Sequence, residues 1–292
     1  MRLNLYGLTI ALGILAAVLY MSKEARRTSL PNDIAMDAVL WAIPPAILFS
    51  RLYYVAFTWE RYRYDLSGIF RIWEGGLAIY GGIIGGALGI LLLSRRRKIP
   101  YSALADLIAP GLILAQAIGR WGNFFNGEAF GRLVVDPAWQ FFPAAVLTNG
   151  EWHMAAFFYE SLWNLLGFLF LIRLKERFRR MGNGYIFLWY LVWYGLGRMV
   201  IEGLRTDSLM LGSLRVSQLL SVVLVTLPGM LMVFRLKLSP FLFLPCFGAL
   251  IFLLFGALSH LWAVVPGFVL LFLFAALLLH AFLKNNQALE KR

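Results

Sequence analysis

Two charged residues interrupt one of the apolar segments of this chain. Arg198 and Glu202 are four residues apart, so on a helix they share one face. An ionisable side chain inside a membrane-spanning segment is costly and generally marks a functional site. Arginine keeps its charge and offers phosphate a planar fork, while glutamate can orient the arginine or accept a proton. The spacing predicts either a catalytic pair or an internal ion pair that holds helices together.

A second concentration of polar residues lies at 119–132. Arginine forks bind phosphate through parallel hydrogen bonds, and glycines let backbone N–H groups approach an anion closely. The segment therefore predicts a phosphate-binding site, with an interfacial loop whose arginines extend toward water as the alternative. Its polar side chains are Arg120, Asn123, Asn126, Glu128 and Arg132.

A third stretch, residues 73–86, combines Tyr80 with six glycines. Glycines at this density are compatible with a binding pocket that a ligand approaches closely. Small residues also let two membrane helices pack against each other. The sequence alone leaves both interpretations open.

The composition indicates the environment in which these residues act. Of 292 residues, 61% are hydrophobic and 14% are charged, and the mean hydropathy is +0.74. Soluble domains have about 25% charged residues, so we predict an integral membrane protein. The formal net charge is +12, but the basic residues form short clusters between apolar runs, as in cytoplasmic loops. This pattern favours the lipid bilayer as partner and excludes nucleic acid.

Apolar segments of spanning length determine the predicted fold. A membrane-spanning helix needs about 20 mainly apolar residues, and the sequence predicts an all-α polytopic membrane protein with about nine transmembrane helices. Basic clusters follow every second segment, which predicts an external N-terminus and a cytoplasmic C-terminus. A polar, aromatic loop is expected outside from Arg120 to about Met154. The predicted segments are 3–21, 38–57, 76–93, 103–118, 155–173, 184–201, 214–234, 241–258 and 262–283.

The run from Gly119 to Gly131 resembles the signature of the prolipoprotein diacylglyceryl transferases, Gly-Arg-x-Gly-Asn-Phe-x-Asn-x-Glu-x-x-Gly. The resemblance covers about residues 3–235. It predicts a family core at 1–235 and an additional transmembrane hairpin with a cytoplasmic tail at 236–292. Further similarities are Leu5-Tyr6-Gly7-Leu8, Trp73 to Gly82, Tyr159-Glu160-Ser161, and Gly197-Arg198 with Glu202, Arg205 and Asp207.

The resemblance implies an enzyme of the bacterial cytoplasmic membrane. Its reaction would transfer the diacylglyceryl group of phosphatidylglycerol to the lipobox cysteine of a prolipoprotein, the first step of lipoprotein maturation. A thioether would form and glycerol phosphate would leave, without a metal, nucleotide or redox cofactor. The implied catalytic residues are Arg120, Arg198, Glu202 and Tyr80. The implied substrate-binding residues are Tyr6, Asn123, Asn126, Glu128, Gly131 and Arg205.

Tyr80 is a departure from the family pattern, because many members carry histidine there. None of the three histidines in the chain replaces it. Two functions of other classes stay open, an anionic-solute transporter and a non-catalytic lipid-binding scaffold. A transporter would favour helix-breaking residues at matching positions of two halves, and the sequence has no such symmetry.

The topology makes a testable prediction. In a Cys246→Ala background, a cysteine at position 126 or 148 should react with a membrane-impermeant thiol reagent added to intact cells. Arg97→Cys should react only after the membrane is opened, because the basic cluster around it is predicted to be cytoplasmic. Labelling of Arg97→Cys from outside would contradict this topology.

Overall fold

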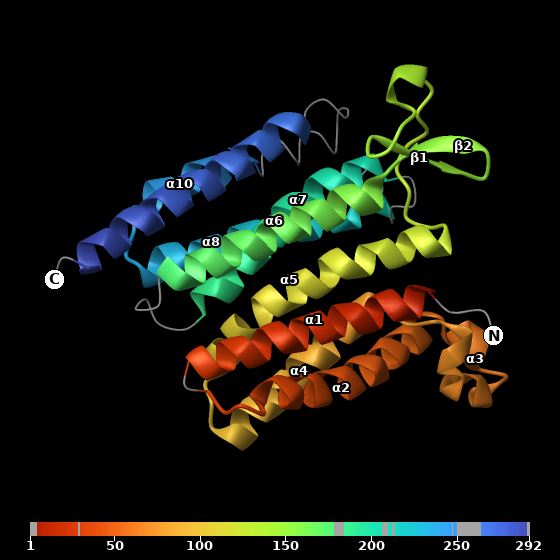
Figure 1. The fold of residues 1–292 in the computed structure, drawn as a ribbon, viewed down its shortest axis with the longest axis horizontal. Coiled ribbons are helices and arrows are strands. Elements are labelled where there is room, and N and C mark those ends of the chain that lie inside the picture. The colour runs from red at the N-terminus through yellow and green to blue at the C-terminus, as the bar shows by residue number, and fades with distance from the viewer. Residues whose placement is uncertain are drawn as a thin grey trace. The chain divides into compact units, whose positions relative to one another are not determined.

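The computed structural model describes residues 5–28, 30–177, 184–205, 210–211, 214–246, 248–249 and 264–290. Most of these residues are helical (Figure 1). The long helices are α1 (Leu5–Arg27), α2 (Ile34–Phe57), α4 (Ile79–Arg97), α5 (Tyr101–Asn126), α6 (Ala156–Arg177), α7 (Tyr185–Leu204), α8 (Val216–Arg235) and α10 (Val264–Glu290). Shorter helical elements are α3 (Trp59–Tyr62), η1 (Leu66–Phe70), η2 (Ile72–Glu74), η3 (Pro137–Trp139) and η4 (Pro240–Phe243).

Within the described residues, seven helices are long and apolar enough to cross a membrane. This confirms the prediction of an all-α polytopic membrane protein. Helix α7 is not among the seven, although it is 20 residues long, because tyrosine, tryptophan and the Arg198–Glu202 pair make it less apolar. The predicted segment 241–258 falls largely outside the described residues. The count of nine spans and the orientation of the ends therefore stay predictions.

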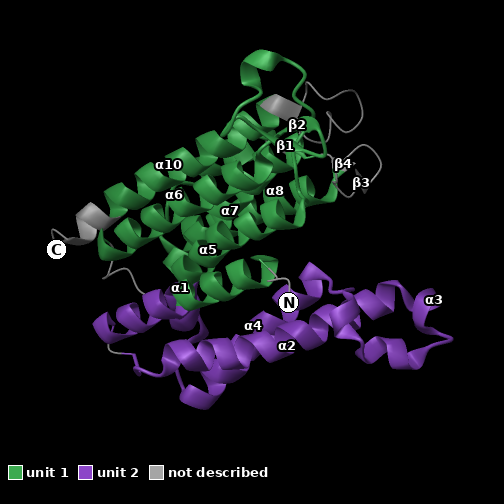
Figure 2. Cartoon of the chain, turned by 45° about the vertical axis from the view of Figure 1, so that its right-hand side comes forward, with its two compact units in different colours: residues 1–17, 109–292 green, residues 18–108 purple. Residues whose placement is uncertain are grey.

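The chain divides into two compact units, coloured separately in Figure 2. Unit 1 comprises Met1–Ala17 and Ala109–Arg292, and unit 2 comprises Val18–Ile108. Helices α1 and α5 each contribute residues to both units. Of the predicted site residues, only Tyr80 belongs to unit 2.

In unit 2, helices α2 and α4 pack closely because α4 has a row of glycines. Gly81, Gly85 and Gly89 recur every fourth residue and therefore share one face of the helix. A Cβ atom on any of them would lie only 1.9–2.2 Å from a main-chain carbonyl oxygen of α2. Small residues of this kind let membrane helices approach each other. The helix-packing interpretation is confirmed for Gly81 and Gly85, and the structure adds Gly89 to the same face.

Arg51 of α2 organises the segment that connects α3 to α4. Its side chain is buried, with 5% of the residue exposed, and it was not among the residues predicted to be functional. The buried guanidinium is compensated by main-chain carbonyls of residues 68–76. It donates hydrogen bonds to the carbonyl oxygens of Gly68 at 2.6 Å, Ile69 at 2.8 Å, Arg71 at 3.4 Å, Gly75 at 2.7 Å and Gly76 at 2.9 Å.

Unit 1 has its core among α6, α7, α8 and α10, which lie side by side in Figures 1 and 2. Phe274 and Phe282 of α10 are fully buried in this core. Phe274 fits against Gly229 of α8, where a Cβ atom would lie 2.4 Å from the phenyl ring. The C-terminal helix is therefore packed into the same core as the helices that carry the predicted site.

Between α5 and α6 the chain forms a β-hairpin of strands β1 (Ala145–Thr148) and β2 (Glu151–Met154). The strands are antiparallel, and Thr148 is opposite Glu151. The two turn residues, Asn149 and Gly150, have φ values of 50° and 83°. A two-residue turn with positive φ at both positions is favoured in hairpins, because its twist matches that of the strands.

Arg51 should be essential for stability. Arg51→Met removes the donor for five carbonyl groups, and each buried acceptor left without a partner costs about 1–3 kcal/mol. We expect a loss of at least roughly 3 kcal/mol, together with faster proteolytic cleavage at residues 60–78. Thermal unfolding in detergent and limited proteolysis measure the two effects. Arg61→Met, which alters an exposed arginine of the same segment, should change neither, and equal behaviour of the two variants would refute the role of Arg51.

Candidate active site

Glu160 joins the two arginines that the sequence singled out. From α6, its carboxylate pairs with Arg120 of α5 at 2.6 Å and with Arg198 of α7 at 3.5 Å. Arg198 also pairs with Glu202, one turn further along α7, at 2.6 Å. Three helices thus bring two guanidinium groups and two carboxylates into one charged cluster, which comprises Arg120, Glu160, Arg198 and Glu202.

Burial differs between the two signs of charge in this cluster. The side chains of Glu160 and Glu202 are 5% and 2% exposed, whereas those of Arg120 and Arg198 are 20% and 18% exposed. An isolated buried ion costs several kcal/mol, so the carboxylates are needed to compensate the arginines. Because the arginine side chains are more exposed than the carboxylates, an anion that enters the site can approach positive charge.

Arg120 lies within a helix. The sequence predicted that the fourth span ends near residue 118 and that an external loop starts at Arg120. The predicted boundary is wrong, because α5 continues to Asn126 and the chain turns at Gly127, with a φ of 68°; the external side of the loop stays a prediction. The polar residues stay helical because Arg120 faces protein and finds its partner on α6. Backbone N–H groups inside a helix are already hydrogen-bonded, so side chains must bind any anion here.

Tyr6 of α1 packs against this polar end of α5. A Cβ atom on Gly122 would lie 2.9 Å from Cδ2 of Tyr6 and 2.6 Å from Oγ1 of Thr9. The glycine therefore permits close approach of α1 rather than forming a nest for phosphate. Asn123, the next residue, is half-buried.

Gly131 and Arg205 form a joint between the segment after α5 and the end of α7. The two residues form an antiparallel bridge, and the N–H of Arg132 donates to the carbonyl of Leu204 at 3.0 Å. Only glycine fits at 131, because a Cβ atom would lie 2.7 Å from Cβ of Met154. These main-chain contacts hold residues 131 and 132 against the end of α7, two to three residues after Glu202.

Asn126 and Glu128 are exposed at the end of α5. The Asn126 amide donates to the Glu128 carboxylate at 3.1 Å, and the Glu128 N–H donates to the Asn123 carbonyl at 3.0 Å. Both side chains can therefore be reached by a ligand. No contact joins them to the charged cluster among the interactions of the described residues, and their binding role stays a prediction.

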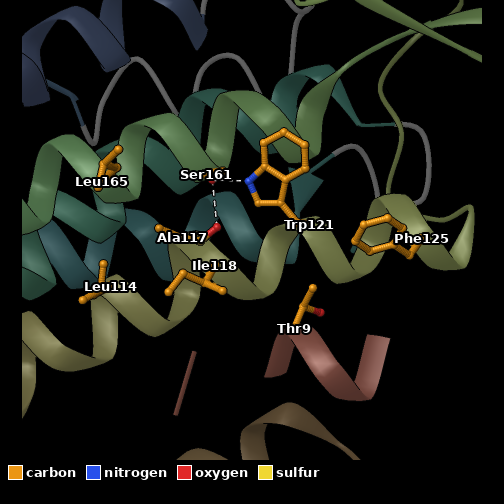
Figure 3. Close-up of a pocket in the computed structure, with 8 residues that line it drawn as sticks. All are labelled: Thr9, Leu114, Ala117, Ile118, Trp121, Phe125, Ser161 and Leu165. Carbon is orange, nitrogen blue, oxygen red and sulfur yellow. Dashed lines mark hydrogen bonds between the residues drawn. The ribbon is translucent and has the colours of Figure 1, made fainter. Parts of the chain in front are cut away.

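Helices α5 and α6, which carry Arg120 and Glu160, also line an apolar pocket of about 390 Å³ (Figure 3). It is lined from α1, α5 and α6, and its members include Trp121 and Ser161, the residues that follow Arg120 and Glu160. The Trp121 indole donates to the Ser161 hydroxyl at 3.1 Å, and that hydroxyl donates to the Ala117 carbonyl at 2.8 Å. The remaining wall is mainly aliphatic, so a polar site adjoins a hydrocarbon-like surface.

A family model of prolipoprotein diacylglyceryl transferases matches residues 1–234. The chain belongs to this family. A phosphatidylglycerol–prolipoprotein diacylglyceryl transferase of Listeria welshimeri is 43% identical over 242 residues, 80% of this chain and 87% of the relative. One from Streptococcus pneumoniae strain JJA is 47% identical over 232 residues, which are 79% and 88% of the two chains.

Tyr80 of this transferase family member lies near the start of α4. Its ring centroid is 6.2 Å from that of Tyr53 on α2. Because Tyr80 belongs to unit 2, its participation in the chemistry of the charged cluster stays a prediction.

Two residues of the site were missed as functional candidates. Glu160 was noted only as part of a family similarity, although a single acidic residue inside a predicted span was itself a signal. Tyr194 lies one turn before Arg198 on α7 and interacts electrostatically with all four charged residues. A tyrosine in an aromatic-rich helix gave no comparable signal in the sequence.

Loss of the charge on Glu160 should destabilise the protein. Glu160→Gln leaves two arginines with one carboxylate, and removing one partner of a buried ion pair costs about 3–5 kcal/mol. Thermal or denaturant unfolding in detergent measures this loss. Glu60→Gln is the control, because the Glu60–Arg63 pair is exposed and such pairs contribute at most about 1 kcal/mol. A Glu160→Gln protein as stable as Glu60→Gln would contradict the compensating role of Glu160.

Proposed function

We propose that this chain transfers the diacylglyceryl group of phosphatidylglycerol to the lipobox cysteine thiol of prolipoproteins in the bacterial cytoplasmic membrane. The cysteine sulfur attacks the glyceryl carbon that carries the phosphate ester. A carbon–sulfur bond forms, the carbon–oxygen bond breaks, glycerol phosphate leaves, and the thiol proton is released. The observation that carries the proposal is the pair of partly exposed arginines, held by buried carboxylates on helices that also line an apolar pocket.

The leaving group explains why two arginines are needed. The phosphate diester of phosphatidylglycerol has one negative charge, and the departing monoester gains a second as the carbon–oxygen bond breaks. Positive groups fixed in advance around the phosphate stabilise this developing charge most effectively in a site of low dielectric constant. In the proposed mechanism Arg120 holds the phosphate and Arg198 faces the oxygen that leaves.

The two carboxylates are positioning residues in this mechanism. Arg198 engages a carboxylate oxygen of Glu202, and Glu160 is shared between both arginines. These contacts fix the guanidinium planes, so their remaining N–H groups point to the substrate. The thiolate is the attacking form of cysteine, and the positive charge of Arg198 favours it over the neutral thiol. Tyr80 keeps its proposed catalytic role, in which its hydroxyl hydrogen-bonds the headgroup or the incoming thiol. Tyr6, Asn123, Asn126, Glu128 and Arg205 are proposed to bind the headgroup or the client peptide.

The apolar pocket supports a lipid rather than a small soluble anion as the substrate. A lipid donor needs a surface for its acyl chain directly beside the site for its phosphate. The pocket provides this surface through Leu114, Ile118 and Leu165 (Figure 3). A carrier of inorganic anions would have no use for an aliphatic wall at this point.

A reconstituted assay tests the proposed function. Purified protein with phosphatidylglycerol and a lipobox peptide should add one diacylglyceryl group to the cysteine, detected by mass, and a cysteine-to-serine peptide should stay unmodified. Arg120→Lys keeps the charge but loses the fork, which costs about 1.5–3 kcal/mol for a charged hydrogen bond and roughly ten- to a hundredfold in turnover. Arg198→Ala should abolish transfer.

Arg63→Lys is the matched control for these variants, because Arg63 forms an exposed pair with Glu60. It should transfer at the wild-type rate. Wild-type protein that leaves the peptide unmodified would refute the proposed function. A folded Arg120→Lys protein with wild-type turnover would refute the bidentate grip on phosphate.

A further inference from the structure

Helices α6 and α7 are joined by two tryptophans whose arrangement is reciprocal. The indole N–H of Trp163 on α6 donates to the carbonyl of Trp193 on α7 at 3.1 Å. The indole N–H of Trp193 donates to the carbonyl of Trp163, also at 3.1 Å. The two rings are stacked, with centroids 4.6 Å apart and planes 24° from parallel. Each helix thus donates a side-chain hydrogen bond to the main chain of the other.

Two glycines make this arrangement possible. Gly167 follows Trp163 by four residues, and Gly197 follows Trp193 by four residues, so each helix has a tryptophan and a glycine on one face. A Cβ atom on Gly197 would lie 2.1 Å from Nε1 of Trp163, and one on Gly167 would lie 2.4 Å from Nε1 of Trp193. Each indole therefore rests on the glycine of the opposite helix. We call these four residues the tryptophan–glycine lock.

The lock fixes the register of the two helices at the charged cluster. Trp163 lies three residues after Glu160, and Gly197 directly precedes Arg198. A slip of one residue between helices moves a side chain about 1.5 Å along the axis and turns it by about 100°. The contact between Arg198 and Glu160 is 3.5 Å, so such a slip would break it.

Helix α10 supports the lock from outside the family core. Phe272 meets Trp163 edge to face, with ring centroids 6.4 Å apart and planes at 84°. Phe170 of α6 stacks on Trp193, with ring centroids 5.0 Å apart. The family model ends at residue 234, so Phe272 lies beyond the matched region, whereas both tryptophans lie within it.

We propose that Trp163 and Trp193 are positioning residues that set Arg198 against Glu160, and that Phe272 braces them. This inference rests on the proposed function for its kinetic consequence, although the placement of Arg198 can be measured without it. Misplacement of a catalytic group by about 1 Å costs up to about a hundredfold in rate. The lock therefore acts on turnover rather than on binding of the lipid.

Three variants in the full-length protein test the lock. Trp163→Phe removes one N–H donor and part of the stacked surface, and Phe272→Ala removes the brace while leaving both tryptophans. Phe274→Ala is the control, because this fully buried residue of α10 packs on Gly229 of α8. Stability, kcat, and KM for phosphatidylglycerol are measured for each folded protein.

We expect Trp163→Phe to lower kcat roughly ten- to a hundredfold with little change in KM. Phe272→Ala should lower kcat to a smaller extent, and Phe272→Tyr should restore it. Phe274→Ala should lower the unfolding temperature but keep kcat. Wild-type kcat in both Trp163→Phe and Phe272→Ala would overturn the inference, as would an equal fall of kcat in Phe274→Ala.

A chemical measurement separates failure of the lock from failure of the proposed function. The arginine reagent phenylglyoxal, followed by peptide mass analysis, reports how accessible Arg198 is, with exposed Arg132 as internal reference. Arg198 should react faster in Trp163→Phe and Phe272→Ala than in the wild type or Phe274→Ala. If the wild type fails to modify the peptide, the proposed function is refuted, and the reactivity of Arg198 alone decides the lock. Unchanged reactivity in both lock variants refutes the lock.

Discussion

Compensation of buried charge is the constraint on which the site depends. Arginine cannot lose its proton in a protein, so an arginine placed among membrane helices must be given a negative partner. Glu160 serves two arginines at once, and the arrangement ties α5, α6 and α7 together through ionic contacts. The same contacts that stabilise the bundle thereby hold the guanidinium groups where an anion can reach them. The side chains of the charged cluster therefore contribute both to stability and to the proposed chemistry.

Close approach of helix backbones is the second recurring requirement. Between membrane helices there is no hydrophobic driving force, so packing and hydrogen bonding must hold them together. Among the described residues, glycines that face a neighbouring helix include Gly85 with α2, Gly122 with α1, and Gly197 with α6. At Gly197 the absence of a side chain leaves room for the indole of Trp163, which also donates a hydrogen bond to the carbonyl of Trp193. Register is therefore specified most strongly where the charged cluster needs it.

Local sequence patterns predicted most of the helices, but they could not predict which distant residues pair with each other. The apolar segments and the Arg198–Glu202 pair follow from helix periodicity, which is readable within a few residues. The pairing of Arg120 with Glu160 joins residues far apart in the chain, and hydropathy cannot reveal it. The same limitation explains the misplaced end of α5, because a polar stretch looks like a loop until its partner helix is known. Arg51 was visible as a lone charge inside a predicted span, but its carbonyl partners were not.

The hydrogen bonds of Arg51 place few requirements on the side chains of the segment between α3 and α4. Its five hydrogen bonds all end on main-chain oxygens, which every amino acid provides. Gly75 and Gly76 are restricted, since both have a positive φ and a Cβ atom on Gly76 would lie 2.5 Å from a guanidinium nitrogen. Substitution of exposed residues such as Phe70 and Trp73 should therefore leave the hydrogen bonds of Arg51 intact. The exposed side chains of this segment can therefore vary while its backbone path is kept.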